Sequence, residues 1–205
     1  HEKQVYELVQ NASDALAKNP DGGAVKLILT SSALYCADSG QGMQEDGVKA
    51  LLGALRSPKQ EGEIGRFGLG FKSVLEITDT PQVFSFPGSF GFDRRHSASV
   101  IRTTFKKDYP NIPVLRLAWP LNPEVEKSKD ETLKELMNWA STIIKMPFND
   151  LKHTGFLGRE LDAFPNEFLL FTDHVNQLIL ENRSRSQATQ RLVSRTLEDG
   201  FVSIF

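Results

Sequence analysis

The stretch Glu7-Leu8-Val9-Gln10-Asn11-Ala12-Ser13-Asp14-Ala15 is the one around which we expect the rest of the chain to be organised. On a helix, at about 100° per residue, Glu7, Asn11 and Asp14 fall on one narrow polar stripe. The apolar residues fall on a separate stripe that faces a core: Val5, Leu8, Val9, Ala12 and Leu16. Two interpretations stay open for this segment alone, a solvated helix edge or a polar stripe that borders a pocket.

The composition is that of a globular chain without a strong charge. The 205 residues are 40% hydrophobic, which suffices for one large domain or one domain with an appendage. A net charge of -2 does not indicate a nucleic-acid or acidic-membrane partner. No apolar run approaches the roughly 18 residues of a membrane span. Cys36 is the only cysteine, so no intramolecular disulfide can form, and we expect a reducing, cytoplasmic location.

The first part of the chain alternates between helical and extended patterns. The segment Asn19-Pro20-Asp21-Gly22-Gly23 ends the first helix with a dense turn signal. The patterns predict helices over residues 2–18 and 44–56, strands over 24–30 and 33–37, and a further helix that ends near residue 77. The chain begins at His1, already inside a helical pattern, so we expect it to be a piece of a longer protein.

The second part of the chain predicts more strands and a change of organisation near residue 149. Strands are expected over residues 82–86, 97–105, 114–118 and 142–148, with a helix over 129–139. Beyond residue 149 the patterns predict a helix over 166–171 and strands over 177–181, 191–196 and 201–205. We therefore expect a main domain over residues 1–148, with residues 149–205 as a C-terminal extension or the start of a following domain.

Asp38-Ser39-Gly40-Gln41-Gly42-Met43 follows directly on a predicted strand. The Asp38 carboxylate can accept a hydrogen bond from an exocyclic amine. Gly40 and Gly42 would let a flat ring approach the backbone closely. Taken alone, the motif is explained better by the ordinary turn chemistry of aspartate before glycine.

A second glycine motif, Gly65-x-x-Gly68-x-Gly70, leads into a predicted helix. Close backbone approach and the free N–H groups of a helix N-terminus make this segment a candidate phosphate cradle. It matches neither the Rossmann spacing G-x-G-x-x-G nor a Walker loop, because Phe71 separates Gly70 from Lys72. The polar segment 57–63 before it has no apolar anchor and is predicted to be a mobile loop.

The three segments, in this order, resemble the GHKL ATPase superfamily of gyrase B, the ninety-kilodalton heat-shock chaperone, histidine kinases and MutL. The Glu7 helix is similar to the family's N-box, and residues 38–43 and 65–73 are similar to its two glycine boxes. The motif sequences are most similar to those of the heat-shock chaperone and sacsin branch, and the resemblance is clearest over residues 2–86. The resemblance implies an α+β Bergerat fold. That fold is a two-layer α/β sandwich with a mixed, mostly antiparallel sheet covered by helices on one face, here with a small C-terminal α/β extension.

The resemblance also implies roles for the residues of the first helix and the first glycine box. Glu7 matches the general base that deprotonates the attacking water, and Asn11 matches the Mg²⁺ ligand. Asp14 would support the pocket from behind them. Asp38 matches the acceptor for the adenine amino group, beside a wall formed by Gly40, Gly42 and Met43.

The remaining matches concern the phosphates and the far side of the adenine. Thr142 resembles the threonine that completes the adenine site, although Ser141 precedes it where the family usually has glycine. Lys72 is at a position that varies between branches, so a phosphate contact and a surface lysine are both open. The remaining matched residues form the phosphate-facing turn and the start of the helix that follows it: Gly65, Arg66, Phe67, Gly68, Leu69, Gly70 and Phe71.

The expected function is ATP binding, with Mg²⁺-dependent hydrolysis that drives rearrangement in a larger chaperone-like or sacsin-like protein. The fragment alone could be a slow or inactive ATPase. Expected partners are ATP or ADP, downstream domains of the same protein, a protein client and a second copy in a homodimer, but no membrane. Three alternatives stay open: a binding-only nucleotide sensor, a histidine-kinase catalytic domain, and a DNA-processing ATPase of the MutL or topoisomerase kind.

Overall fold

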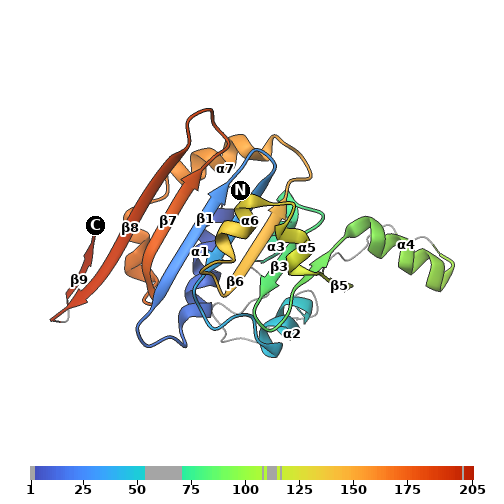
Figure 1. Ribbon diagram of the computed structural model, residues 1–205, viewed down its shortest axis with the longest axis horizontal. Helices are drawn as coiled ribbons and strands as arrows, with labels where there is room; N and C mark the ends of the chain where they lie inside the picture. The colour runs from blue at the N-terminus through green and yellow to red at the C-terminus, as the bar shows by residue number, and fades with distance from the viewer. Residues whose placement is uncertain (1–2, 54–70, 108, 110–114, 116, 200) are drawn as a thin grey trace.

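The computed structural model describes residues 3–53, 71–107, 109, 115, 117–199 and 201–205. Its strands are β1 (Gly23–Leu29), β2 (Ala33–Asp38), β3 (Gln82–Ser85), β4 (Phe90–Phe92), β5 (Ala118–Pro120), β6 (Thr142–Pro147), β7 (Val175–Asn182), β8 (Thr189–Glu198) and β9 (Phe201–Ile204). These nine described strands form one open sheet in the order β5-β4-β3-β6-β2-β1-β7-β8-β9 (Figure 1).

Helices lie on both faces of this sheet. They are α1 (Gln4–Leu16), α2 (Glu45–Gly53), α3 (Phe71–Ile77), α4 (Arg94–Phe105), α5 (Pro123–Lys127), α6 (Glu131–Leu136), α7 (His153–Asp162) and the 3-10 helix η2 (Asn166–Phe171). The larger of two hydrophobic cores joins the apolar stripe of α1 to α3, α7, η2 and one face of the sheet. The predicted apolar stripe is confirmed, because Val5, Leu8, Val9, Ala12 and Leu16 are all buried.

The opposite face of the sheet is covered in part by α5 and α6, which lie in front of it in Figure 1. Leu133 and Leu136 of α6 pack there against Ile28, Tyr35 and other buried residues. Successive residues of β1 and β2 therefore serve the two cores alternately, as the period of a strand requires. The mixed, mostly antiparallel sheet confirms the predicted α+β class, and the structure adds this second covered face to the expected single one.

The C-terminal segment continues the same sheet. Strand β7 pairs with β1 in parallel, with Leu178 opposite Val25, and β8 pairs with β7 antiparallel. All the other strand pairs of the described residues are antiparallel. A parallel neighbour requires a long crossover, and residues that include α7 and η2 supply its last part. The domain boundary at residue 148 stays a prediction.

The predicted strand over residues 97–105 is wrong, because this segment belongs to helix α4. Asp93 caps the helix: its Oδ1 accepts a hydrogen bond from the backbone N–H of His96 at 2.9 Å. Alternating apolar and β-branched residues indicated a strand, but the cap satisfies the first free N–H groups of a helix. For the predicted strand 114–118, residues 114 and 116 lie outside the described ones, and the strand found there is β5, from Ala118.

Helix α7 was not predicted, because two glycines inside it weaken the helical signal. The structure gives a reason for one of them. A Cβ at Gly158 would lie 3.2 Å from Nδ2 of the buried Asn182, at the end of β7, so any side chain here would require Asn182 to shift by a few tenths of an ångström. Close packing on β7 takes precedence over helix propensity at this position.

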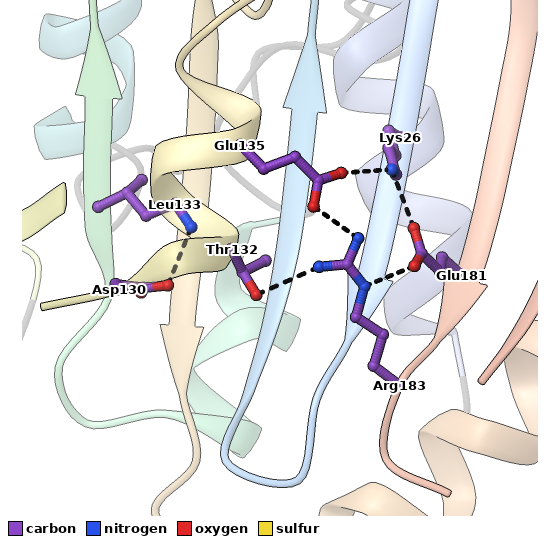
Figure 2. A network of polar contacts seen from close by, with 7 residues as sticks. All are labelled: Lys26, Asp130, Thr132, Leu133, Glu135, Glu181 and Arg183. Carbon is purple, nitrogen blue, oxygen red and sulfur yellow. Dashed lines mark hydrogen bonds and ion pairs between the residues drawn. The ribbon is translucent and has the colours of Figure 1, made fainter. Parts of the chain in front are cut away.

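A network of charged side chains fastens α6 to the sheet (Figure 2). Nζ of Lys26, on β1, lies 2.8 Å from Oε1 of Glu135 and 2.9 Å from Oε2 of Glu181, on β7. Arg183 binds the same two carboxylates through Nη2 and Nε, with Nη2 at 2.7 Å from Glu135. Burial acts to raise the pKa of Glu181, but hydrogen bonds from Arg183 and Lys26 outweigh it, so the pKa lies below its ordinary value.

Lys26→Met is expected to lower the free energy of unfolding by about 1–3 kcal/mol at pH 7, because it leaves the buried Glu181 carboxylate with fewer partners. The lowered pKa values of Glu135 and Glu181 also fix the sign of a pH effect. Their stabilising contribution is complete above the ordinary glutamate pKa and is lost as the pH falls through the lowered values. Urea unfolding at pH 7 and pH 4 should therefore show that the free energy of unfolding falls less on acidification in Lys26→Met than in the wild type.

The matched control is Lys49→Met. Lys49 forms an i, i+4 pair with Glu45 on α2, but its side chain is 67% exposed, so its removal is expected to cost less than about 0.5 kcal/mol. Equal losses of stability in the two variants would show that the network adds nothing beyond an ordinary surface pair.

Candidate nucleotide site

A cavity of about 560 Å³ opens beside α1, at the ends of β2 and β6 and the loop that leads to α2. Its volume is in the usual range for a small-molecule site. Six of the predicted site residues line it: Asn11, Asp14, Asp38, Gly42, Met43 and Thr142. Thr142 lies about a hundred residues or more along the chain from the other five, so only the folded sheet brings all six to one place.

Helix α1 forms one wall of the cavity with Leu8, Asn11, Ala12 and Asp14. Burial raises the pKa of the Asp14 carboxyl, and the charge of His174 acts in the opposite direction. Glu7 lies one turn before Asn11 and is not among the residues that line the cavity. Its Oε2 atom is buried and has no hydrogen-bond partner in the described part of the chain.

The N-terminus of α1 is held by side chains from other helices. Lys3, at the N-cap, forms no side-chain capping bond, and instead the backbone N–H of Val5 donates to Oε1 of Glu160, on α7, at 3.0 Å. Nε2 of Gln4 donates to Oε2 of Glu76, on α3, at 3.1 Å. The C-terminal segment thus helps to place the helix that carries Glu7 and Asn11, which no local pattern could predict.

Asp38 ends β2 as a buried carboxyl group, with 6% of its surface exposed. Its Oδ1 accepts a hydrogen bond from the backbone N–H of Gly40 at 2.9 Å. Burial raises the pKa of Asp38 to about 6, although the bond from Gly40 acts to lower it. At neutral pH the group is therefore largely ionised, and both of its oxygens can accept hydrogen bonds.

The two glycines of the first glycine box have different surroundings. A Cβ at Gly40 would lie 3.0 Å from the carbonyl oxygen of Ala15, so Gly40 permits close packing against the end of α1 and does not line the cavity. Gly42 lines it, with a φ of +76° that disfavours any other residue. The predicted close approach of a flat ring therefore concerns Gly42 and Met43.

Thr142 lies directly beside Asp38, because β6 pairs with β2 in a register that places these two residues opposite each other. The Thr142 side chain is buried and lines the cavity, with Ile144 and Cys36 further along the same two strands. Burial and the Asp38 charge raise the pKa of the Cys36 thiol, which keeps it neutral. The part of the cavity that β2 and β6 line is thus apolar except at the strand ends, where Asp38 and Thr142 lie.

Some predicted residues lie outside the described ones, and their roles stay predictions. These are the loop 57–63 and the glycine segment Gly65, Arg66, Phe67, Gly68, Leu69 and Gly70. Phe71 and Lys72 begin helix α3, which confirms the predicted helix after the glycine motif. Conversely, sequence reasoning did not select Lys18, Gln41, Gln44 and Asp46, which line the cavity, since isolated polar residues give no distinguishing signal.

Over the described ranges, no group of three or more histidine, cysteine, aspartate or glutamate side chains is placed to hold a metal ion. None of the helices found there is long and apolar enough to cross a membrane.

Comparison with known proteins gives one family and two relatives. Residues 1–132 match the model of the family described as histidine kinase-, DNA gyrase B-, and HSP90-like ATPase. A stretch of 158 residues is 32% identical to the chaperone protein HtpG of Chlorobium luteolum, covering 61% of this chain and 25% of HtpG. A stretch of 91 residues is 32% identical to protein NO VEIN of Arabidopsis thaliana, covering 43% of this chain and 3% of that protein. The chain therefore matches only a small part of either relative.

Proposed function

This chain belongs to the family of histidine kinase-, DNA gyrase B- and HSP90-like ATPases, and we propose that it binds ATP in the 560 Å³ cavity and hydrolyses it with Mg²⁺. The observation that carries the proposal is the convergence of Asn11, Asp14, Asp38 and Thr142 on that one cavity. Each comes from an element that the larger core or the sheet holds in place.

The adenine is assigned to the inner end of the cavity. The ionised Asp38 carboxylate accepts a hydrogen bond from the amino group of the base, and Thr142 completes this polar edge from the neighbouring strand. Gly42 and Met43 provide a close backbone approach and an apolar contact for the ring. The glycine segment 65–70 is assigned to the phosphates.

The residues present suit a magnesium ion that is bound mainly through phosphate. Mg²⁺ in nucleotide sites keeps several waters and takes only one or two protein oxygens, and the amide oxygen of Asn11 is the one we assign. When bound, Mg²⁺ would neutralise charge on the phosphates during transfer. The buried Oε2 atom of Glu7 lacks a partner in the described ranges, as a group that waits for an ordered water would.

Glu7 is assigned as the general base for hydrolysis. Its carboxylate accepts a proton from the water whose oxygen bonds to the γ-phosphorus, while the bond from that phosphorus to ADP breaks. The products are ADP and inorganic phosphate. Asp14 acts from the next turn of α1, where it supports this arrangement without a reacting role.

We propose a chaperone-like or sacsin-like setting, in which the nucleotide state rearranges downstream domains of a cytoplasmic protein that acts on a client, as a homodimer. The match to a chaperone protein supports the chaperone-like part of this proposal. The competing candidate is a binding-only module that switches a partner. The carboxylate oxygen of Glu7, which has no hydrogen-bond partner among the described residues, favours hydrolysis, since a binding-only site does not need a base at that position.

The test is a calorimetric titration of the protein with ATP, ADP and GTP, with and without Mg²⁺, followed by phosphate-release measurements on the natural protein. We expect binding of both adenine nucleotides, tighter ATP binding with Mg²⁺, and weaker binding of GTP. Absence of any adenine-nucleotide binding would overturn the proposal. Binding of ATP without phosphate release, in the presence of all the natural domains, would favour the binding-only module.

A further inference from the structure

Three polar side chains form a row across neighbouring strands at the cavity. The register of β2 with β6 places Asp38 opposite Thr142, and the register of β6 with β3 places Thr142 opposite Ser85. Residues directly opposite one another in antiparallel strands project from the same face of a sheet. Ser85 is thus the third member of a row whose first two members line the cavity, although Ser85 itself does not line it.

The hydroxyl of Ser85 joins two segments that border the cavity. Its Oγ accepts a hydrogen bond from the backbone N–H of Met43 at 2.7 Å. It donates to the carbonyl oxygen of Ser141, the residue before Thr142, at 3.3 Å. The Ser141 carbonyl also accepts from the N–H of Phe86, and the Ser141 N–H donates to the Asp38 carbonyl at 2.8 Å.

Loss of the hydroxyl would therefore affect one partner most. Ser141 would keep its bond from Phe86, but the N–H of Met43 would lose the only acceptor found for it in the described structure. Gly42, the residue before Met43, also lies close to this hydroxyl, because a Cβ built on Gly42 would lie 3.0 Å from Oγ of Ser85. The hydroxyl thus sets both the position and the hydrogen bonding of the Gly42–Met43 wall.

We propose that Ser85 is a positioning residue that holds the Gly42–Met43 wall at a fixed distance from Asp38 and thereby sets the affinity for the purine base. This inference rests on the proposed function, since it takes the base to lie between this wall and the Asp38–Thr142 edge. Ser85 lies on β3, away from Glu7 and Asn11 on α1. It therefore acts on binding of the base and leaves the chemical step unchanged.

The test compares Ser85→Ala with Ser85→Thr, which keeps the hydroxyl, using adenosine and ATP as probes in calorimetric titrations. Ser85→Ala is expected to raise the Kd of both ligands by the same factor, about 5- to 20-fold, because the lost contact concerns the shared base. Phosphate release at saturating ATP should stay at the wild-type rate. Ser85→Thr should restore the Kd to within about threefold of wild type.

Ser97→Ala is the matched control, because it removes a buried serine hydroxyl on α4 that has no hydrogen-bond partner in the described ranges. Its Kd for adenosine should equal that of the wild type.

Wild-type affinity in Ser85→Ala, or equal weakening in Ser85→Ala and Ser85→Thr, would overturn the inference. So would a parallel fall in affinity and turnover, which indicates general loosening. If the wild type binds ATP but the Ser85 series shows no effect, only this inference fails; if the wild type binds neither probe, the proposed function fails as well.

Discussion

Glu7→Ala is expected to lower phosphate release by about 10²- to 10⁴-fold, the usual contribution of a general base, while the Kd for ATP changes by less than about threefold. The separation of the two effects has a structural reason. Glu7 lies a full turn of α1 away from Asn11 and is not among the residues that line the cavity. Removal of its carboxylate therefore leaves the binding surface intact and deprives only the attacking water of its base.

The measurement combines single-turnover phosphate release in the natural protein with ATP titration of the same samples. Gln10→Ala is the control on the same helix, because Gln10 is exposed and its substitution should alter neither quantity. Unchanged turnover in Glu7→Ala would assign the base to another residue. A large rise in Kd would instead place Glu7 in the binding surface.

Asp38→Asn is expected to weaken binding of ATP and ADP by about 10- to 150-fold. A hydrogen bond to an ionised acceptor contributes about 1.5–3 kcal/mol, and asparagine can present an amide donor to the amino group of adenine, where the wild type presents only acceptors. Calorimetric titration measures the loss. Thermal unfolding is the control, because burial disfavours the ionised carboxyl, so a neutral asparagine should leave the stability equal or higher. Normal ATP affinity in this variant would contradict the adenine assignment.

The same carboxyl group predicts a pH dependence in the wild type. Its pKa is about 6, and only the ionised form accepts a hydrogen bond through both oxygens. Binding should therefore weaken as the pH falls through 6, by up to about tenfold at pH 5 relative to pH 7.5. Adenosine is the suitable ligand, because it has no phosphate group that titrates in this range. A pH-independent Kd for adenosine would show that Asp38 does not contact the base.

Local sequence patterns predicted the elements closest to the site well. The helix over residues 2–18 and the strands over 24–30 and 33–37 correspond to α1, β1 and β2, because amphipathic and alternating patterns report directly on burial. The same reasoning failed for α4, where the Asp93 cap outweighed an alternating pattern, and for α7, where Gly158 packs closely against Asn182. The first contact is local to the helix, whereas the second joins the helix to a distant strand.

Some residues of the site could also be predicted from the sequence, and others could not. Asn11, Asp14 and Asp38 could be selected from the sequence through the resemblance of the three ordered motifs to an ATPase superfamily, although neither the helix stripe nor the Asp38 motif identifies a ligand site alone. Nothing local selects Ser85, which is one serine at the end of a short strand. Its position opposite Thr142 follows only from the β3–β6 register.

The sequence by itself determined that α1 has a buried apolar stripe beside a polar one, and that an acidic residue and two glycines follow β2. These are properties of residues a few positions apart, which helix and strand periodicity relate to burial. Only the tertiary structure decided that Thr142 lies beside Asp38, and that Glu160 of the C-terminal segment caps the helix of Glu7. Strand register and helix docking fix those neighbours over more than a hundred residues, through backbone hydrogen bonds and core packing that no local pattern records.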